Sequence, residues 1–342
     1  MKNISTILLK LLCMGVFLIS LLSSCSLSES GMARSSGSVN ELLIVTNDKN
    51  QWEGPLGDTI RAFFSTDQIG LPQPEPVFDL INIADENFSD LFTKFHNIFI
   101  VDINPQTTET ASETMLNQWS EPQRVIKITA PDLHSFYSEF DLKKETFIKL
   151  FIDLERKRTL TINKLIMDVG LSGILEKKFG ISFPLTEGFY LAKETDNFVW
   201  IRHKMTKAKR DMEISIMVYS MDYQDTIVFN PKHIIHWRNT MTLEYIPGPS
   251  PLSFMKVARE FKPPVFDTIT DFPGGFAVET RGLWEVENDF MGGPFINYTF
   301  INRANNKVIT LDGYVFNPND DKKNFLRQLE AMFFATKFTT KE

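Results

Sequence analysis

Cysteine is scarce in this sequence of 342 residues, which contains only Cys13 and Cys25. Cys13 lies in an apolar stretch near the N-terminus that has the character of a removable leader, so we expect one thiol to remain in the mature chain. One thiol can form neither an intramolecular disulfide nor a zinc site built from several cysteines. The stability of the folded protein must therefore come from its core.

A hydrophobic run long enough to cross a membrane as a helix is also missing. Such a helix needs roughly 20 apolar residues, whereas the run over residues 11–22 has about a dozen. It follows Lys2 and Lys10, and its length is typical of the apolar region of a secretory signal peptide. The run ends in L-S-S-C, which resembles the lipobox of bacterial lipoproteins, where small residues precede a cysteine.

This resemblance implies that residues 1–24 are a signal peptide and that Cys25 is acylated and becomes the new N-terminus. Two or three acyl chains would then hold the protein firmly at a membrane. The alternative is a buried anchor helix with an incidental cysteine. The polar segment that follows the run, S-L-S-E-S-G, argues against this alternative.

An excess of positive charge is absent as well. Removing Lys2 and Lys10 with the leader leaves 34 basic against 43 acidic residues, a net charge of −9. The sequence has no basic stripe that alternates with aromatic residues, so we expect no nucleic-acid partner.

The common catalytic motifs are missing too, including G-x-S-x-G, G-x-G-x-x-G, the P-loop and H-E-x-x-H. Ser253 and Lys256 match S-x-x-K, the nucleophile motif of penicillin-recognising enzymes, but the K-T-G element that this mechanism needs is not present. His233 and His236 share a face of a predicted helix without a third metal ligand. We therefore predict no catalytic residue, no cofactor and no metal.

Acidic residues alternate over Glu285, Glu287 and Asp289, so on a strand their side chains point the same way. Paired carboxylates serve glycoside hydrolysis, but an exposed acidic strand face explains them equally well.

The pattern along the chain predicts two folded units after a Ser/Gly-rich tether over residues 25–40. Residues 41–180 alternate strand and helix, which favours a layered α/β unit. Its segment 97–103, N-I-F-I-V-D-I, is apolar throughout, as in a buried parallel strand. Residues 181–342 contain successive strands with helices set aside, which predicts an α+β unit with an antiparallel sheet and flanking helices.

Two unusual segments carry the residues that we consider for binding. L-P-Q-P-E-P, residues 71–76, has prolines that keep it out of a sheet interior. R-G-L-W-E-V-E-N-D-F-M-G-G-P-F, residues 281–295, places a tryptophan, an amide and an arginine near two glycines. We expect the two segments to form one surface. The candidate binding residues are Trp52, Gln73, Glu75, Arg281, Trp284, Asn288, Gly292 and Gly293.

These segments, together with F-V-W-I-R and R-N with Y-I-P-G downstream, resemble the Bacteroidota lipoproteins grouped as domain of unknown function 4837. The resemblance covers nearly the whole mature chain. It implies an envelope lipoprotein with no assigned activity, so no catalytic residues are carried over. In such bacteria, export to the cell surface is associated with acidic residues directly after the lipidated cysteine. Here Glu29 is the only acidic residue soon after Cys25. The resemblance therefore favours a lipid anchor in the outer membrane facing the periplasm.

The same lineage implies O-glycosylation at Asp followed by Thr and an apolar residue. The triplet D-T-I occurs three times, which makes Thr59, Thr226 and Thr268 candidate glycosylation sites. For function we favour a binding or scaffold protein of envelope maintenance with an envelope protein or glycan as partner. The alternative is an enzyme that acts on envelope glycans or peptides, which would need a pocket with convergent ionisable groups.

Overall fold

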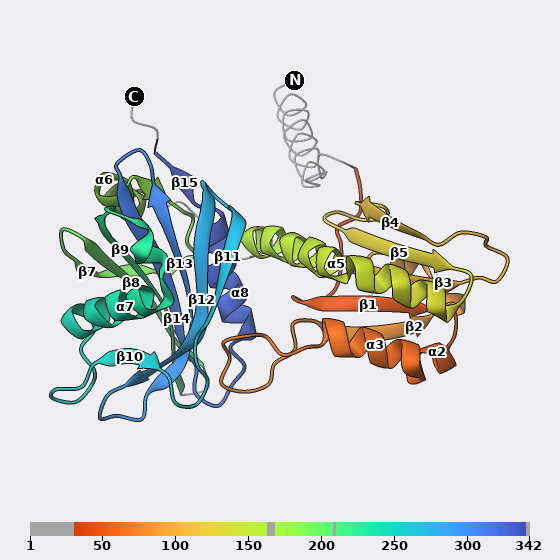
Figure 1. Ribbon diagram of the computed structural model, residues 1–342, viewed down its shortest axis with the longest axis horizontal. Coiled ribbons are helices and arrows are strands. Elements are labelled where there is room, and N and C mark those ends of the chain that lie inside the picture. Colours follow the sequence, from red (N-terminus) through yellow and green to blue (C-terminus); the bar gives the residue numbers. More distant parts are fainter. Residues whose placement is uncertain (1–30, 163–167, 208–209, 340–342) are drawn as a thin grey trace, which may run out of the picture.

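The computed structural model describes residues 31–162, 168–207 and 210–339. Within these residues the chain forms two units that lie side by side (Figure 1), an N-terminal unit with the first sheet and a C-terminal unit with a larger one. None of the helices in these ranges combines the length and the apolarity needed to cross a membrane.

The N-terminal unit is the predicted layered α/β structure. In the described residues its sheet has five strands in the order β2-β1-β3-β5-β4, all parallel except β4. The strands are β1 (Glu41–Thr46), β2 (Asp79–Ala84), β3 (Asn97–Ile103), β4 (Ala111–Leu116) and β5 (Arg124–Ala130).

Helices cover both faces of this sheet, which explains the apolar run in β3. On one face α3 and α5 pack against side chains such as Phe99 and Ile126. On the other, the segment around α4 packs aromatic rings against Ile98 and Val125. The helical elements are α2 (Lys49–Glu53), α3 (Pro55–Phe64), η1 (Asp85–Asn87), α4 (Asp90–Thr93) and α5 (Leu133–Ile162).

The C-terminal unit is built on the predicted antiparallel sheet, which is curled (Figure 1). Its strand order is β10-β12-β13-β14-β9-β8-β7, and β11 pairs with the first half of β12. The strands are β7 (Tyr190–Glu194), β8 (Phe198–Lys207), β9 (Arg210–Asp222), β10 (Met255–Ala258), β11 (Val265–Phe272), β12 (Gly275–Val286), β13 (Gly292–Asn302) and β14 (Lys307–Phe316).

Two helices cover one face of this sheet and a third covers the other. α6 (Val169–Phe179) and α8 (Lys323–Phe334) bury their apolar residues against the first face. α7 (Pro231–Tyr245), capped by the Asn230 side chain, packs with β10 on the second. The remaining elements are the short β6 (Ile181–Ser182) and β15 (Lys337–Phe338), which pair with each other, and η2 (Thr226–Phe229).

The boundaries of both units differ from the predicted ones. The folded part starts before Glu41, because Ser35 N donates to Glu121 O at 3.0 Å and Ser36 N donates to Lys94 O at 2.8 Å. The second unit starts before residue 181, because α6 packs into the C-terminal core. Sequence periodicity identifies α6 as a helix but does not show which core it joins.

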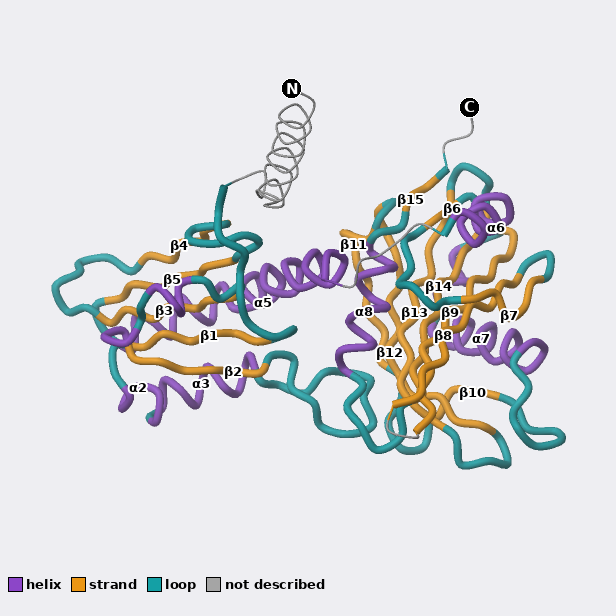
Figure 2. The backbone as a smooth tube through the Cα atoms, turned by 180° about the vertical axis from the view of Figure 1, so that it is seen from behind, coloured by secondary structure: helices purple, strands orange, loops and turns teal. Residues whose placement is uncertain are grey.

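Helix α5 connects the two units. It packs on the N-terminal sheet and then extends to α8 (Figure 2), where its last turns contact that helix. On the other side of the interface Lys323 forms an ion pair with Asp79 at 2.9 Å, and Asn40 Nδ2 donates to Asn324 Oδ1 at 2.8 Å. Contacts on both sides hold the units together and leave a cleft between them.

Candidate functional site

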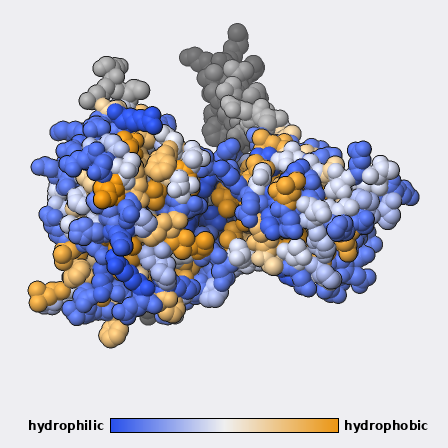
Figure 3. All heavy atoms as spheres, viewed as in Figure 1, coloured by the Kyte–Doolittle hydropathy of each residue, from blue (hydrophilic) through white to orange (hydrophobic). Residues whose placement is uncertain are grey.

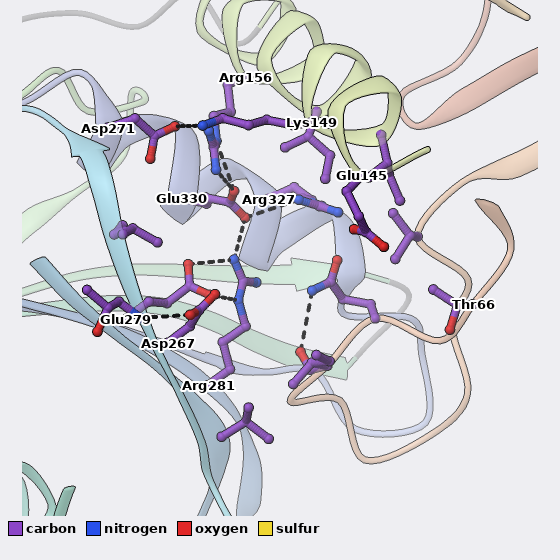
Figure 4. Close-up of a pocket in the computed structure, with 18 of the residues that line it drawn as sticks. Thr66, Glu145, Lys149, Arg156, Asp267, Asp271, Glu279, Arg281, Arg327 and Glu330 are labelled. Carbon is purple, nitrogen blue, oxygen red and sulfur yellow. Dashed lines mark hydrogen bonds and ion pairs between the residues drawn. The ribbon is translucent and has the colours of Figure 1, made fainter. Parts of the chain in front are cut away.

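A cleft of about 590 Å³ lies between the two units. The space-filling view shows the waist where the two lobes meet (Figure 3). The walls come from α5, from the loop after α3, from β11 and β12, and from α8 (Figure 4). A volume of this size suits a small molecule.

A buried carboxylate, Glu330 of α8, forms the centre of the cleft floor. Its Oε1 accepts hydrogen bonds from Nε and Nη2 of Arg156 at 2.9 and 2.7 Å. Its Oε2 accepts from Arg281 Nη2 at 2.9 Å and from Arg327 Nη1 at 3.3 Å. Arg156 belongs to the N-terminal unit, so this network connects the two units through charge-assisted hydrogen bonds.

A second carboxylate extends the floor along β12. Glu279 accepts from Nε and Nη2 of Arg281 at 2.6 and 3.0 Å, and from the Tyr298 hydroxyl at 2.6 Å. Glu279 and Arg281 are two residues apart on a strand, so both side chains face the cleft. Arg156 also forms an ion pair with Asp153 at 2.8 Å, so the three guanidinium groups are matched by three carboxylates.

The charges of the floor shift the pKa values of its members. Burial would raise the pKa of the Glu330 carboxyl, but Arg281, Arg156 and Arg327 together lower it well below its usual range. Burial lowers the pKa of Arg327, and the nearby Glu330 only partly opposes this effect. The positive charge of Arg327 is therefore less well compensated than that of Arg281, whose pKa is raised.

Three buried polar atoms at the cleft have no hydrogen-bond partner among the described residues: Arg281 Nη1, Arg327 Nε and Gln68 Oε1. Their residues are 8, 7 and 8 % exposed. Buried polar groups in folded proteins are nearly always hydrogen-bonded. Other unpartnered atoms occur elsewhere in the chain, but these three belong to residues that line one cavity.

The mouth of the cleft is acidic. Asp67, Glu145 and Asp267 line it, are exposed, and form no ion pair with another described residue. Lys149 is paired with Asp271 at 2.9 Å, so its charge is already compensated. The cleft thus has a floor lined by guanidinium groups and an acidic mouth.

The comparisons with known proteins divide the chain where the structure does. The model of Domain of unknown function (DUF4837) matches residues 171–335. This part of the chain is a DUF4837 domain. The model of Domain of unknown function (DUF8532) matches residues 35–164. The DUF4837 domain is therefore confined to the C-terminal unit, and L-P-Q-P-E-P lies in the other domain, contrary to the predicted extent of the family.

No curated protein matches the chain. Among solved structures, the chain is similar to LpqN, described as involved in cell envelope biogenesis of Mycobacterium tuberculosis. The identity is 13 %, over 47 % of this chain and 83 % of that chain, and the TM-score is 0.28. A similarity of this size carries no argument about function.

The structure brings the proline-rich loop next to the DUF4837 domain, but the contacts are structural. The Glu75 carboxylate is buried and accepts the backbone N–H groups of Lys322 and Lys323 at 2.7–3.0 Å. It thereby caps the N-terminus of α8, where free N–H groups need acceptors. Gln73 Nε2 donates to Asp320 O at 3.1 Å. Both predicted binding residues hold the loop against α8.

Arg281 and Trp284 do not share a surface. They are three residues apart on β12, so they face opposite sides of the sheet. Arg281 lines the cleft, whereas Trp284 is buried beside Tyr314 and donates from Nε1 to Val315 O at 3.3 Å. The prediction of one surface formed by the two segments is therefore wrong.

Gly292 and Gly293 belong to β13 and pair with Glu285 and Trp284. Neither has a positive φ, so a left-handed turn conformation is not the reason for glycine at these positions. A Cβ at Gly293 would lie 2.1 Å from Val315 O. Position 293 therefore requires glycine, because the backbone of Val315 approaches it closely.

Trp52 and Asn288 lie away from the cleft. Trp52 is half-buried in α2, with the Arg61 guanidinium 4.4 Å from its ring centre. Asn288 has a φ of 60° in the turn between β12 and β13, next to the fully exposed Phe290. This turn contacts the loop that carries the exposed Leu252, through Ser250 Oγ and Asp289 Oδ2 at 3.2 Å.

The candidate modification sites differ in accessibility. Thr226 and Thr268 are exposed, and Thr268 belongs to β11 beside the cleft. Thr59 is half-buried in α3, and its hydroxyl donates to Pro55 O. Cys25 lies outside the described residues.

The weaker catalytic patterns have structural explanations. Ser253 is buried and donates to Ser250 O at 2.6 Å, and Lys256 forms ion pairs with Glu285 and Glu287. No group of three metal-ligating side chains lies together within the described ranges, and this includes His233 and His236 of α7.

Sequence reasoning missed most of the cleft. Gln68, Arg156, Arg327 and Glu330 come from a loop and two helices that are far apart in the chain. Arg327 and Glu330 are three residues apart on a helix, a spacing that equally describes a surface ion pair. Only their burial distinguishes them, and burial follows from the tertiary structure.

Proposed function

We propose that this chain is a lipid-anchored envelope protein that binds a small polar molecule in the cleft between its two units. Acylated Cys25 holds it in the outer membrane of a Bacteroidota cell, facing the periplasm. The leader, the L-S-S-C sequence and the scarcity of acids after Cys25 support the location. The cleft supports the binding function.

One observation carries the binding function. Arg281 and Arg327 present unpartnered, buried N–H groups at the floor of a cavity in the described structure. A buried donor without an acceptor costs free energy in the unliganded protein. A ligand that supplies acceptors there removes this cost, so the floor is organised to receive one.

The floor is suited to holding a ligand rather than to moving protons. A general acid or base needs a pKa near the working pH. Here the neighbouring charges lower the pKa of Glu330, and guanidinium groups stay charged in proteins. Burial and Glu279 raise the pKa of Tyr298 well above its usual value. Binding is therefore a better interpretation than enzymatic action on glycans or peptides.

Blocking the cleft tests this function. Asp267 is an exposed residue at the mouth that pairs with Glu279 across β11 and β12. In Asp267→Trp the bulky ring would fill the entrance. We expect wild-type protein, incubated with small molecules extracted from the host envelope and repurified, to release a compound on denaturation. Asp267→Trp should release at least tenfold less, as measured by mass spectrometry.

Asp225→Trp is the matched control. Asp225 also begins a D-T-I triplet, is exposed, and accepts a local backbone N–H, from Ile227, as Asp267 does from Thr268. It is not part of the cleft lining. Recovery of the same compounds from wild type and Asp267→Trp would rule out the cleft as the binding site.

A further inference from the structure

We propose that the ligand is a short peptide with a free C-terminal carboxylate, which lies at the guanidinium donors of the floor, and a free ammonium group, which lies at the acidic mouth. This inference rests on the proposed binding function. It names the chemical class of the ligand from three features of the cleft, namely the floor, the mouth and the free edge of β11.

The floor requires an anion that carries a hydrogen-bond donor beside it. Arg281 Nη1 and Arg327 Nε are unpartnered donors of charged groups, and Gln68 Oε1 is an unpartnered acceptor. Arg281 and Arg327 meet at the floor, because they bind the same oxygen of Glu330, and Gln68 lines the same cavity. A peptide C-terminus has the required pair of groups, since its carboxylate accepts two hydrogen bonds and the adjacent amide N–H donates one.

The mouth favours a cation. Asp67, Glu145 and Asp267 are exposed lining residues without an ion-pair partner in the described ranges. A peptide ammonium or a lysine-like amine would interact favourably with these carboxylates. A glycan made of uronic acids would bring further negative charge to the same place and would be repelled.

The wall between floor and mouth is a strand with a free edge. β11 pairs with β12 on one side and with no other described strand. All residues from Val265 to Asp271 line the cleft, so the main chain of this edge borders the cavity. An extended peptide can hydrogen-bond to such an edge as an added strand. Sugars lack the regular alternation of N–H and C=O groups that this edge recognises.

The experiment compares two peptide libraries on the immobilised mature chain. One contains random tripeptides with free carboxyl groups, and the other contains the same tripeptides as C-terminal amides. We expect retention of members of the free library and at least tenfold weaker retention of their amides, because a charged hydrogen-bonding group is lost. N-acetylation of the retained peptides should weaken binding several-fold. Glucuronate and inorganic phosphate serve as anion controls.

Gln68→Leu removes the unpartnered acceptor while keeping a similar side-chain size. We expect roughly tenfold weaker binding of the retained peptides. Gln224→Leu, at an exposed position outside the cleft lining, should bind them as wild type does. Equal retention of acids and amides, retention of neither library, or glucuronate or phosphate binding as tightly as the peptides would overturn the assignment.

The proposed function can survive that failure. If extracted envelope molecules bind wild type but not Asp267→Trp, while neither peptide library is retained, the cleft binds a ligand of another class. If, in addition, the extract contains no compound that binds wild type but not Asp267→Trp, both proposals fail.

Discussion

Glu330→Gln should lower the free energy of unfolding by about 3–5 kcal/mol, because it removes a buried charge that pairs with the buried Arg281 and Arg327 and with the partly buried Arg156. The glutamine has nearly the same shape as the glutamate, so packing is preserved and the electrostatic effect is isolated. Glu279 would remain beside Arg281 and Asp153 beside Arg156, whereas Arg327 would lose its ion-pair partner. Chemical denaturation near neutral pH measures the loss.

The same substitution should change the pH dependence of stability. The pKa of Glu330 is lower in the folded protein than in the unfolded chain. Its contribution is therefore complete above the ordinary carboxyl pKa of about 4.5 and is lost progressively as the pH falls below that value. Denaturation curves between pH 7 and pH 3 should accordingly show a shallower loss of stability for Glu330→Gln than for wild type.

Glu287→Gln provides the control. Glu287 is partly exposed and pairs with Lys256 at the surface of the DUF4837 domain. Exposed ion pairs contribute little, so its loss should cost less than about 1 kcal/mol. Equal effects of the two substitutions would contradict the role given to Glu330.

Trp284→Ala should also be strongly destabilising, by about 3–5 kcal/mol. The ring is 2 % exposed and packs edge-on against Tyr314 with 5.4 Å between ring centres. Truncation leaves a cavity and deprives Val315 O of the indole N–H. Thermal and chemical denaturation measure the loss.

Trp52→Ala is the comparison variant. Trp52 is half-buried in α2 of the other unit, so its truncation should lower the free energy of unfolding by less. Trp284 faces away from the cleft, so folded Trp284→Ala protein should bind the ligand as wild type does. A variant that keeps wild-type stability but loses binding would restore the original interpretation of Trp284 as a binding residue.

The fold class could be predicted because local patterns reflect which faces are covered. The continuous apolar segment of β3 indicated a sheet covered on both faces. Asn230 followed by Pro231 is a pair typical of a helix start, and α7 begins there. β10 and β11 were missed. β11 reads V-F-D-T-I-T-D-F, with charged and hydroxyl side chains that a surface loop could equally carry.

The site was only partly predictable, for a physical reason. The sequence analysis singled out Arg281, but as part of one surface with Trp284. Side chains alternate along β12, so these two residues lie on opposite faces of the sheet. Glu75 was singled out as well, but its carboxylate caps α8. The partners of Arg281 are supplied by α8 and β12, and its neighbours Arg156 and Gln68 come from α5 and from the loop after α3. Only the docking of the two units brings them together.

The most direct test of the account follows the side-chain Nε–H group of Arg327 by nuclear magnetic resonance. This donor has no partner in the described structure and lies at the floor of the cleft. In protein labelled with ¹⁵N-arginine, titration with the bound ligand should shift the Nε–H resonance of Arg327 and slow its exchange with water, while the resonance of Arg61 in the N-terminal unit stays unchanged. Saturating binding that leaves the Arg327 resonance in place would contradict the account.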